Sequence, residues 1–303
     1  MSRPVLRTIL SLAAAVALTA SCGTSSPGVA QQEAAPTQQR TTPPANQITK
    51  VLVFVVENHS MSQMRTGMPW VYDQALTYGY TTDYHAIRHP SLPNYLSIAG
   101  GSTFGVADDR PPASHPLSGP SVFGRALASG HTAKLYAESM PAACYRANSG
   151  EYAVRHNPWT YFTAERSACL RRDVSLSSLA GDVTNGRLPN VGVVIPNVCN
   201  DAHDCSLATA NRWLRAKVGA VKAGPDFTSG RLAIVITADE DDHNEGNKVL
   251  TVVLQKSLHG RVVGTALNHY GLSRSLSQVT HTTPLRHAAS ATSVLSAFGL
   301  RYG

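Results

Sequence analysis

The chain has 303 residues and a formal net charge of +7, with 26 Lys and Arg against 19 Asp and Glu. The positive charge is spread thinly and includes no basic run of the kind that binds nucleic acid, so we expect no nucleic-acid partner. Residues 48–303 have the length of one large α/β domain, here the expected catalytic domain, and contain no second linker and no internal repeat.

The N-terminal residues predict an export signal followed by a linker. Arg3 and Arg7 precede an apolar stretch, Ile9 to Ala20, that is too short to span a bilayer, so residues 1–21 are expected to be a signal peptide. Residues 22–47 are rich in Ser, Thr, Gln, Pro and Ala, and they cannot bury enough apolar surface to fold. We expect them to form a disordered tether.

The end of the export signal resembles a bacterial lipobox, Leu18-Thr19-Ala20-Ser21-Cys22, in which the cysteine is lipidated. Thr19 stands where an aliphatic residue is usual, and Gly28-Val29-Ala30 offers an alternative cleavage site. We therefore expect an exported protein, either a cell-envelope lipoprotein on the outer face of the membrane or a secreted one. The lipid on Cys22 is the only membrane contact that we expect.

Five apolar runs rich in Val and Ile predict strands covered on both faces, at residues 50–56, 132–137, 190–195, 231–237 and 249–254. Helical patterns lie between and beyond them, at residues 69–78, 93–100, 121–129, 206–222, 272–279 and 284–298. Strands that alternate with helices indicate an α/β fold with a mostly parallel central sheet sandwiched between helices. Residues 101–120 and 139–170 have little periodicity, so we expect long loops there.

Four cysteines remain once Cys22 is set aside, an even number for a chain expected to reach an oxidising compartment. Three pairings exist, and we expect Cys144–Cys169 and Cys199–Cys205 because each closes a local loop. A structural zinc site is the alternative, but the spacings are irregular and no Cys-x-x-Cys occurs.

Oxygen-bearing side chains follow three of the predicted strands. Glu57 and Asn58 end the strand at 50–56, Asn197 follows the strand at 190–195, and Asp239 and Glu240 follow the strand at 231–237. Ligands bind at the carboxyl ends of strands in such sheets. Separately these residues could be turns, caps or a solvated acidic loop. Together, in a basic protein, they favour one divalent cation, Ca²⁺, Mg²⁺ or Mn²⁺, or Zn²⁺ if histidines join them.

The segment His89-Pro90-Ser91-Leu92-Pro93-Asn94-Tyr95 predicts a nucleophile beside that cation. The apolar spacing that follows predicts a helix beginning near Pro93 or Asn94. Ser91 would then precede a helix N-terminus, where free N–H groups favour a phosphate. Ser91 could be only an N-cap, but a nearby metal would lower the pKa of its hydroxyl, and Asn94 would donate hydrogen bonds to the phosphoryl oxygens.

The chain resembles the phosphoesterase family of bacterial and fungal acid phosphatases and phospholipase C enzymes, within the alkaline-phosphatase-like superfamily. The resemblance covers nearly all of residues 48–303. It is carried by Glu57-Asn58-His59, the segment His89 to Tyr95, Tyr136-x-Glu138-x-Met140-Pro141, Tyr152-x-x-x-His156-Asn157-Pro158, Pro196-Asn197 with Asp201-x-His203-Asp204, and Thr237-x-Asp239-Glu240.

The resemblance implies roles for these residues. Ser91 matches the phosphorylated nucleophile and Asn94 the phosphate-contacting asparagine. Metal-binding strand ends are matched by Glu57, Asn58, Asp239 and Glu240. Asp201 and His203 match a second metal or leaving-group site, and His156 matches a further family motif. We expect His89 and Asn197 beside the substrate or behind the metal ligands.

Two residues depart from the two-zinc pattern of the superfamily. Asn197 stands where an aspartate is expected, and Glu240 stands where a histidine is expected. These differences weaken zinc binding, so we expect one hard cation, with histidines binding phosphate or protonating the leaving group.

We therefore expect a metal-dependent hydrolase of small phosphate esters, in which Ser91 is phosphorylated, His156 or His203 protonates the leaving group, and water clears the phosphoserine. Monoesters are favoured because the chain stops soon after the catalytic domain. The alternatives are a phospholipase C-type phosphodiesterase and a solute-binding lipoprotein without turnover. A serine esterase is disfavoured, since no Gly-x-Ser-x-Gly occurs.

Overall fold

The computed structural model describes residue 20 and residues 46–303. The expected signal peptide, the lipidation of Cys22 and nearly all of the expected tether lie outside the described residues. Within the described part, no helix combines the length and the apolar character needed to cross a membrane.

The centre of the domain is a mixed sheet of eight strands in the order β10-β3-β9-β8-β2-β7-β5-β6. The strands are β2 (Lys50–Val56), β3 (Gly79–Thr81), β5 (Ala133–Ala137), β6 (Asp173–Ser175), β7 (Val191–Ile195), β8 (Leu232–Ala238), β9 (Thr251–Leu254) and β10 (Arg261–Val263). β9 is antiparallel to β3 and β8, and the other neighbouring pairs are parallel. The predicted α/β class is confirmed.

Two short sheets lie outside the central one. β1 (Gln47–Ile48) pairs in parallel with β12 (Arg301–Tyr302), and β4 (Tyr84–His85) pairs in parallel with β11 (Leu267–Asn268). The first pair joins the two ends of the described domain, since the Gly303 amide also donates a hydrogen bond to the Ile48 carbonyl.

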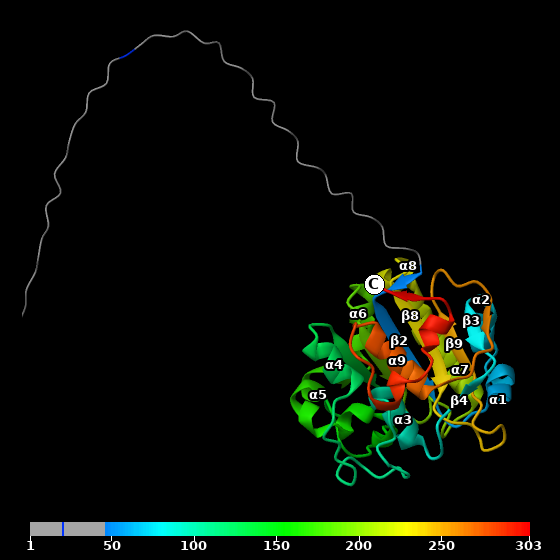
Figure 1. The fold of residues 1–303 in the computed structure, drawn as a ribbon. Coiled ribbons are helices and arrows are strands. Elements are labelled where there is room, and N and C mark those ends of the chain that lie inside the picture. Colours follow the sequence, from blue (N-terminus) through cyan, green and yellow to red (C-terminus); the bar gives the residue numbers. More distant parts are fainter. Residues whose placement is uncertain (1–19, 21–45) are drawn as a thin grey trace, which may run out of the picture. The chain divides into compact units, whose positions relative to one another are not determined.

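Two groups of helices pack on the sheet (Figure 1). In one group α9 (His269–Gln278) contacts α3 (Ser91–Gly100), α4 (Val122–Ala128) and α10 (Val294–Ala297). In the other, α7 (Leu207–Ala223) contacts α1 (Met61–Gly67), α2 (Pro69–Thr77), α6 (Ser178–Thr184) and α8 (Pro225–Thr228). Every residue of β7 and β8 is buried, as expected for strands covered on both faces.

Three local expectations were wrong. The helix expected from residue 93 begins at Ser91, because a proline in the first helical turn removes an N–H group that would have no helical partner anyway. The stretch 139–170 is not a long loop throughout: it contains η1 (Val154–His156), η2 (Pro158–Tyr161), η3 (Thr163–Glu165) and the start of α5 (Arg166–Arg172). The pattern at 284–298 forms two short helices, η4 (Arg286–Ala289) and α10, because Ser293 caps a new helix start.

Both expected disulfides are present. Cys144 pairs with Cys169, which ties the 139–170 region to α5, and Cys199 pairs with Cys205, which closes the loop that follows β7. The alternative of a structural zinc site is thereby excluded, because these sulfur atoms are bonded to one another.

Candidate active site

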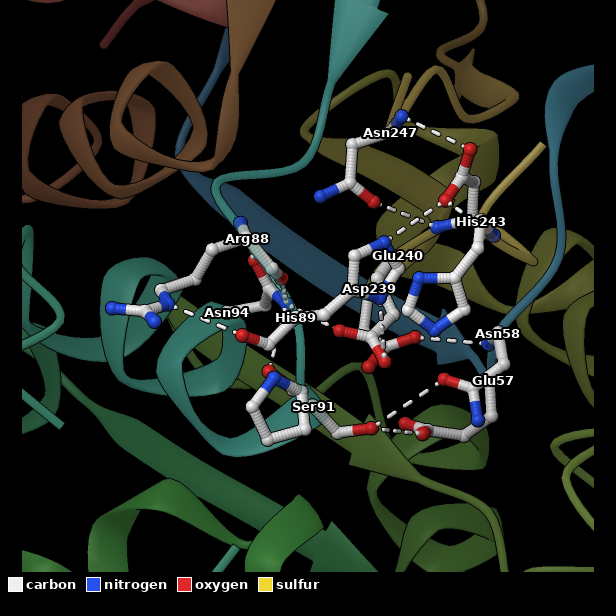
Figure 2. A network of polar contacts seen from close by, with 12 residues as sticks. Glu57, Asn58, Arg88, His89, Ser91, Asn94, Asp239, Glu240, His243 and Asn247 are labelled. Carbon is white, nitrogen blue, oxygen red and sulfur yellow. Dashed lines mark hydrogen bonds and ion pairs between the residues drawn. The ribbon is translucent and has the colours of Figure 1, made fainter. Parts of the chain in front are cut away.

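The adjacent parallel strands β2 and β8 bring two acidic strand ends together. Val56 lies opposite Ala238 in the register, so Glu57 and Asp239 follow at the same edge of the sheet. The Asn58 amide donates a hydrogen bond to Asp239 Oδ1 at 3.0 Å. Figure 2 shows the side chains of Glu57, Asn58, Asp239 and Glu240 gathered around one place.

Ser91 meets this cluster from the first turn of α3. Its Oγ donates a hydrogen bond to Glu57 Oε2 at 3.0 Å and lies 3.5 Å from Asn58 Oδ1 (Figure 2). Pro90, not Ser91, is the N-cap residue, so the alternative that Ser91 serves only as a cap is wrong. The hydroxyl thus lies among the acidic groups, in a first helical turn in which the Leu92 amide is bonded to Asp109 Oδ1 and Pro93 has no N–H group.

These residues fit a hard divalent cation. Asp239 is fully buried, and its Oδ2 has no hydrogen-bond partner among the described residues. Burial, and then the charge of Glu57, raise the pKa of Asp239 well above its usual value and raise the pKa of Glu240 to about 8. A cation bound by these oxygen atoms would offset this repulsion, and the absence of sulfur from the donor set favours Ca²⁺, Mg²⁺ or Mn²⁺.

His156 lies between two buried carboxylates. Its Nε2 is 3.1 Å from Glu57 Oε2 and its Nδ1 is 3.2 Å from Asp201 Oδ2. Burial alone would lower the pKa of His156, but the charge of Glu57 and the contacts with both carboxylates outweigh it and raise the pKa to about 9. These three residues could also hold an ion. We favour the ion pair, because each ring nitrogen already faces a carboxylate oxygen within 3.2 Å.

Tyr95 anchors Glu57 and was missed by the sequence analysis. Its hydroxyl donates a short hydrogen bond to Glu57 Oε1, and its ring stacks on that of His156 with centroids 5.2 Å apart. Tyr95 is one helical turn beyond Ser91, so i, i+4 spacing on α3 would have placed both on one face.

Asn94 is buried and makes several bonds within the protein. Its Oδ1 accepts hydrogen bonds from the amides of Ile87 and Arg88, at 3.0 and 3.2 Å. Its Nδ2 donates to Glu240 Oε2 at 3.1 Å and to the carbonyl of Arg88. Asn94 therefore fixes both the segment before Ser91 and one expected metal ligand, while its expected contact with phosphate stays a prediction.

His89 borders an opening beside the carboxylates. Its Nδ1 lies 3.2 Å from Glu240 Oε1 and its Nε2 lies 3.1 Å from Asp241 Oδ1, and its ring stacks on His243 with centroids 3.7 Å apart. His89, Asp241 and His243 line a cavity of about 430 Å³. The expectation that His89 lies near the substrate stays a prediction.

Asp201 and His203 reach the site from the disulfide-closed loop after β7. The Asp201 carbonyl accepts a hydrogen bond from the Glu57 amide at 2.8 Å. His203 is about one-third exposed, with Nδ1 against Asp204 Oδ1 at 2.6 Å and Nε2 against an Arg155 guanidinium nitrogen at 3.0 Å.

Asn197 lies further from the cluster and holds the base of the same loop. Its Nδ2 donates to Glu151 Oε2 at 2.6 Å, and its Oδ1 accepts from the Asn200 amide at 2.9 Å. Asn197 thus acts on the site through the loop that carries Asp201.

His269 supports the site from behind. Its Nε2 donates to the Asp239 carbonyl at 2.6 Å, and its Nδ1 accepts from the Tyr84 hydroxyl at 2.9 Å. Burial lowers the pKa of His269 to about 4, although the bond to Asp239 opposes this. The sequence around His269 does not distinguish this supporting role from an ordinary contact in the core.

Comparison with known proteins agrees with this geometry. The profile of the phosphoesterase family matches residues 44–274. The chain is 29% identical over 282 residues to a protein of Mycobacterium tuberculosis named phosphatidylinositol-3-phosphatase, covering 92% of this chain and 91% of that one. It is 27% identical over 228 residues to an acid phosphatase of Aspergillus fumigatus, covering 69% of this chain and 49% of that protein. The chain therefore spans about half the length of that fungal relative.

Solved structures show the same fold at much lower identity. A protein of the alkaline phosphatase superfamily from Vibrio parahaemolyticus matches with a TM-score of 0.56 at 10% identity, over 82% of this chain and 71% of that one. The lipoteichoic acid synthase LtaP from Listeria monocytogenes matches with a TM-score of 0.57 at 7% identity, over 82% and 77%. This chain belongs to the phosphoesterase family, with an alkaline-phosphatase-like fold, and is a hydrolase that acts on phosphoric ester bonds.

Proposed function

We propose that the protein is an exported, metal-dependent phosphomonoesterase that works through a phosphoserine at Ser91. One observation carries the proposal: Ser91 Oγ lies 3.0 Å from Glu57 Oε2, in the first turn of α3 and beside a cluster of buried oxygen ligands. A nucleophilic serine needs a neighbouring acceptor for its proton, and a phosphoryl group needs positive charge around it.

In the proposed first step, Ser91 Oγ attacks phosphorus and its proton passes to Glu57 Oε2, the atom to which it already donates. Burial would raise the pKa of Glu57, but its pairing with His156 lowers it, so the carboxylate is ionised and able to accept. When bound by Glu57, Asn58, Asp239 and Glu240, a hard cation would acidify the hydroxyl and offset charge on the phosphoryl oxygens. Water then hydrolyses the phosphoserine.

The proton for the leaving alkoxide has two candidate donors. Both ring nitrogens of His156 face carboxylates and its side chain is 1% exposed, whereas the side chain of His203 is 31% exposed. We assign proton delivery to His203, because its side chain is the more exposed of the two. Its Nε2 accepts from Arg155 here, so it would take up a proton once the guanidinium turns away. His156 is assigned a positioning role, in which it holds the carboxylates of Glu57 and Asp201 in place.

Two observations support the finer parts of the proposal. The named relatives from Mycobacterium tuberculosis and Aspergillus fumigatus are both phosphatases, which favours monoesters over diesters. All four cysteines of the described domain form disulfides, and disulfides persist in oxidising compartments, which supports export.

The test is Ser91→Ala measured with p-nitrophenyl phosphate, with Ser97→Ala as the matched control. Ser97 is a buried serine on the same helix whose Oγ donates to the Pro93 carbonyl at 2.7 Å. Loss of a nucleophile is expected to lower kcat by at least about 10³-fold, while Ser97→Ala keeps it. Normal turnover by Ser91→Ala would show the nucleophile assignment to be wrong.

Two further measurements test the cation and the ester class. EDTA is expected to abolish turnover, and one particular divalent ion is expected to restore it; turnover that persists after complete chelation contradicts metal dependence. Bis-p-nitrophenyl phosphate is expected to be a poor substrate, and faster hydrolysis of this diester than of the monoester would contradict the phosphomonoesterase assignment.

A further inference from the structure

Arg155 is a cation at the site that the proposed mechanism leaves without a role. It lies on η1 directly before His156, and η1 packs against α3, the helix of Ser91. The Arg155 side chain is 19% exposed. Its Nη2 lies 3.0 Å from His203 Nε2, and its Nε lies 3.9 Å from Asp109 Oδ2.

Asp109 connects this guanidinium to the nucleophile. Its Oδ1 accepts a hydrogen bond at 2.9 Å from the amide of Leu92, the residue directly after Ser91. One carboxylate therefore contacts both the chain next to Ser91 and, at longer range, Arg155.

Both residues adjoin segments that carry the cluster around Ser91. Asp109 contacts the amide of Leu92, directly after Ser91. Arg155 directly precedes His156, whose Nε2 lies 3.1 Å from Glu57 Oε2. Arg155 and Asp109 are therefore each one residue away from a group that contacts Glu57 or acts as the proposed nucleophile.

The charge balance of the cluster favours a further cation for the substrate's anion. A phosphate monoester carries close to two negative charges, and it would enter a cluster already holding several carboxylates. His156 is committed to two of them. Arg88 is exposed at its guanidinium, bonds to the His89 carbonyl, and points away from the carboxylates in Figure 2. Among the described residues, the Arg155 guanidinium contacts only His203 and Asp109, so it keeps N–H donors for a ligand. A planar guanidinium matches two phosphoryl oxygens.

We propose that Arg155 binds the phosphoryl oxygens of the substrate, and that Asp109 holds the guanidinium in place until the substrate's anion replaces it. Asp109 is then a positioning residue that competes with phosphate. The proposal rests on the assignment of Ser91 as nucleophile, and it adds the residue that recognises the anion.

The first experiment compares Arg155→Ala, Arg155→Lys and the control Arg110→Ala. Arg110 is also paired with an aspartate, Asp108, but it is 67% exposed and faces solvent. With p-nitrophenyl phosphate as substrate and inorganic phosphate as inhibitor, Arg155→Ala is expected to raise KM and the inhibition constant about tenfold or more. Arg155→Lys should recover part of this loss, and Arg110→Ala should change neither constant. An unchanged phosphate inhibition constant in a folded Arg155→Ala protein overturns the proposal.

The second experiment tests the competition. Asp109→Asn is expected to lower the inhibition constant of phosphate several-fold, because the competing charge is gone, whereas Asp108→Asn should not. A weaker binding of phosphate to Asp109→Asn would contradict the proposed role of Asp109. The two proposals fail separately. If the Ser91→Ala protein stays active, the nucleophile assignment is wrong. If Ser91→Ala is inactive but Arg155→Ala leaves the phosphate inhibition constant unchanged, only the proposed anion site is wrong.

Discussion

Asp173 is a carboxyl group buried away from the catalytic cluster. It begins β6, and its Oδ2 accepts a hydrogen bond from Asn157 at 2.8 Å, while its Oδ1 lacks a hydrogen-bond partner within the described chain. Burial raises the pKa of Asp173 from 3.8 to about 8, and neither Asn157 nor Arg166 offsets this. The folded state therefore holds a proton that the unfolded state releases across this pH range.

The sign of the pH dependence follows from that difference. Where the native state binds more protons than the unfolded state, stability falls as pH rises, by up to about 1.4 kcal/mol per pH unit for one group. The loss from Asp173 should begin near its unfolded pKa and end near pH 8. An amide in its place does not titrate and keeps the shape of the side chain.

We therefore predict that Asp173→Asn gains stability relative to the native protein as the pH is raised from 5 to 8. Urea unfolding of both proteins at three pH values gives the difference in their unfolding free energies. The contributions of the other titrating groups cancel in this difference. A difference that stays constant with pH would contradict the protonated state of Asp173.

Several site residues could be read from the sequence because each follows an apolar strand or a proline-bounded helix start. Glu57, Asn58 and Asp239 are of this kind, and the adjacent parallel strands bring them together. Asp109 and Arg155 could not be predicted in this way. They come from segments without periodicity, and their roles arise only from contacts made across the folded chain.

At the scale of elements, the two disulfides act on loops of very different size. Cys144–Cys169 spans 25 positions and Cys199–Cys205 spans 6. Chain entropy predicts that removal of the larger loop closure costs about 3.5 kcal/mol and removal of the smaller about 2 kcal/mol. Both loops carry residues of the candidate site. Arg155 and His156 lie near the middle of the larger loop, on η1, which packs against α3, whereas Asp201 and His203 each lie two positions from a cysteine of the smaller loop.

Replacing both cysteines of each pair by serine should separate stability from activity. The Cys144→Ser/Cys169→Ser protein is expected to lose more unfolding free energy and to keep its kcat at temperatures where it is folded. The Cys199→Ser/Cys205→Ser protein is expected to lose less stability but at least about tenfold in kcat, because Asp201 no longer holds His156 and the Glu57 amide in place. Urea unfolding and steady-state kinetics provide the two readouts, and the reverse pattern would contradict this division.

The strongest strands and their mostly parallel arrangement were predictable, whereas the antiparallel direction of β9 and the short strands were not. β2, β5, β7 and β8 are continuous apolar runs, but β3, β6 and β10 have three residues each, too few for a pattern. β9 is antiparallel because the acidic segment between β8 and β9 contains no helix, and a parallel neighbour needs a crossover of a dozen or more residues that is usually helical.

For the whole molecule, we predict that the crowded carboxylates make stability depend on a divalent cation. A ligand that binds only the native state stabilises it by about 2.7 kcal/mol when present at 100 times its Kd. We predict that the activating divalent ion raises Tm by about 5 °C or more. Sodium chloride at equal ionic strength is the control, and Glu240→Gln, which removes one ligand charge, should reduce the gain. Equal Tm values with and without the divalent ion would contradict a metal site formed by these residues.

The pairing of β1 with β12 places the two ends of the described domain at the start of β2, while the catalytic cluster lies at its other end. The 7 residues of β2 separate the two by about 20 Å, and in Figure 1 the C-terminus lies at the opposite end of the domain from α3. A bead or sensor chip coupled through Gly303 would therefore leave the candidate active site facing the bulk solution.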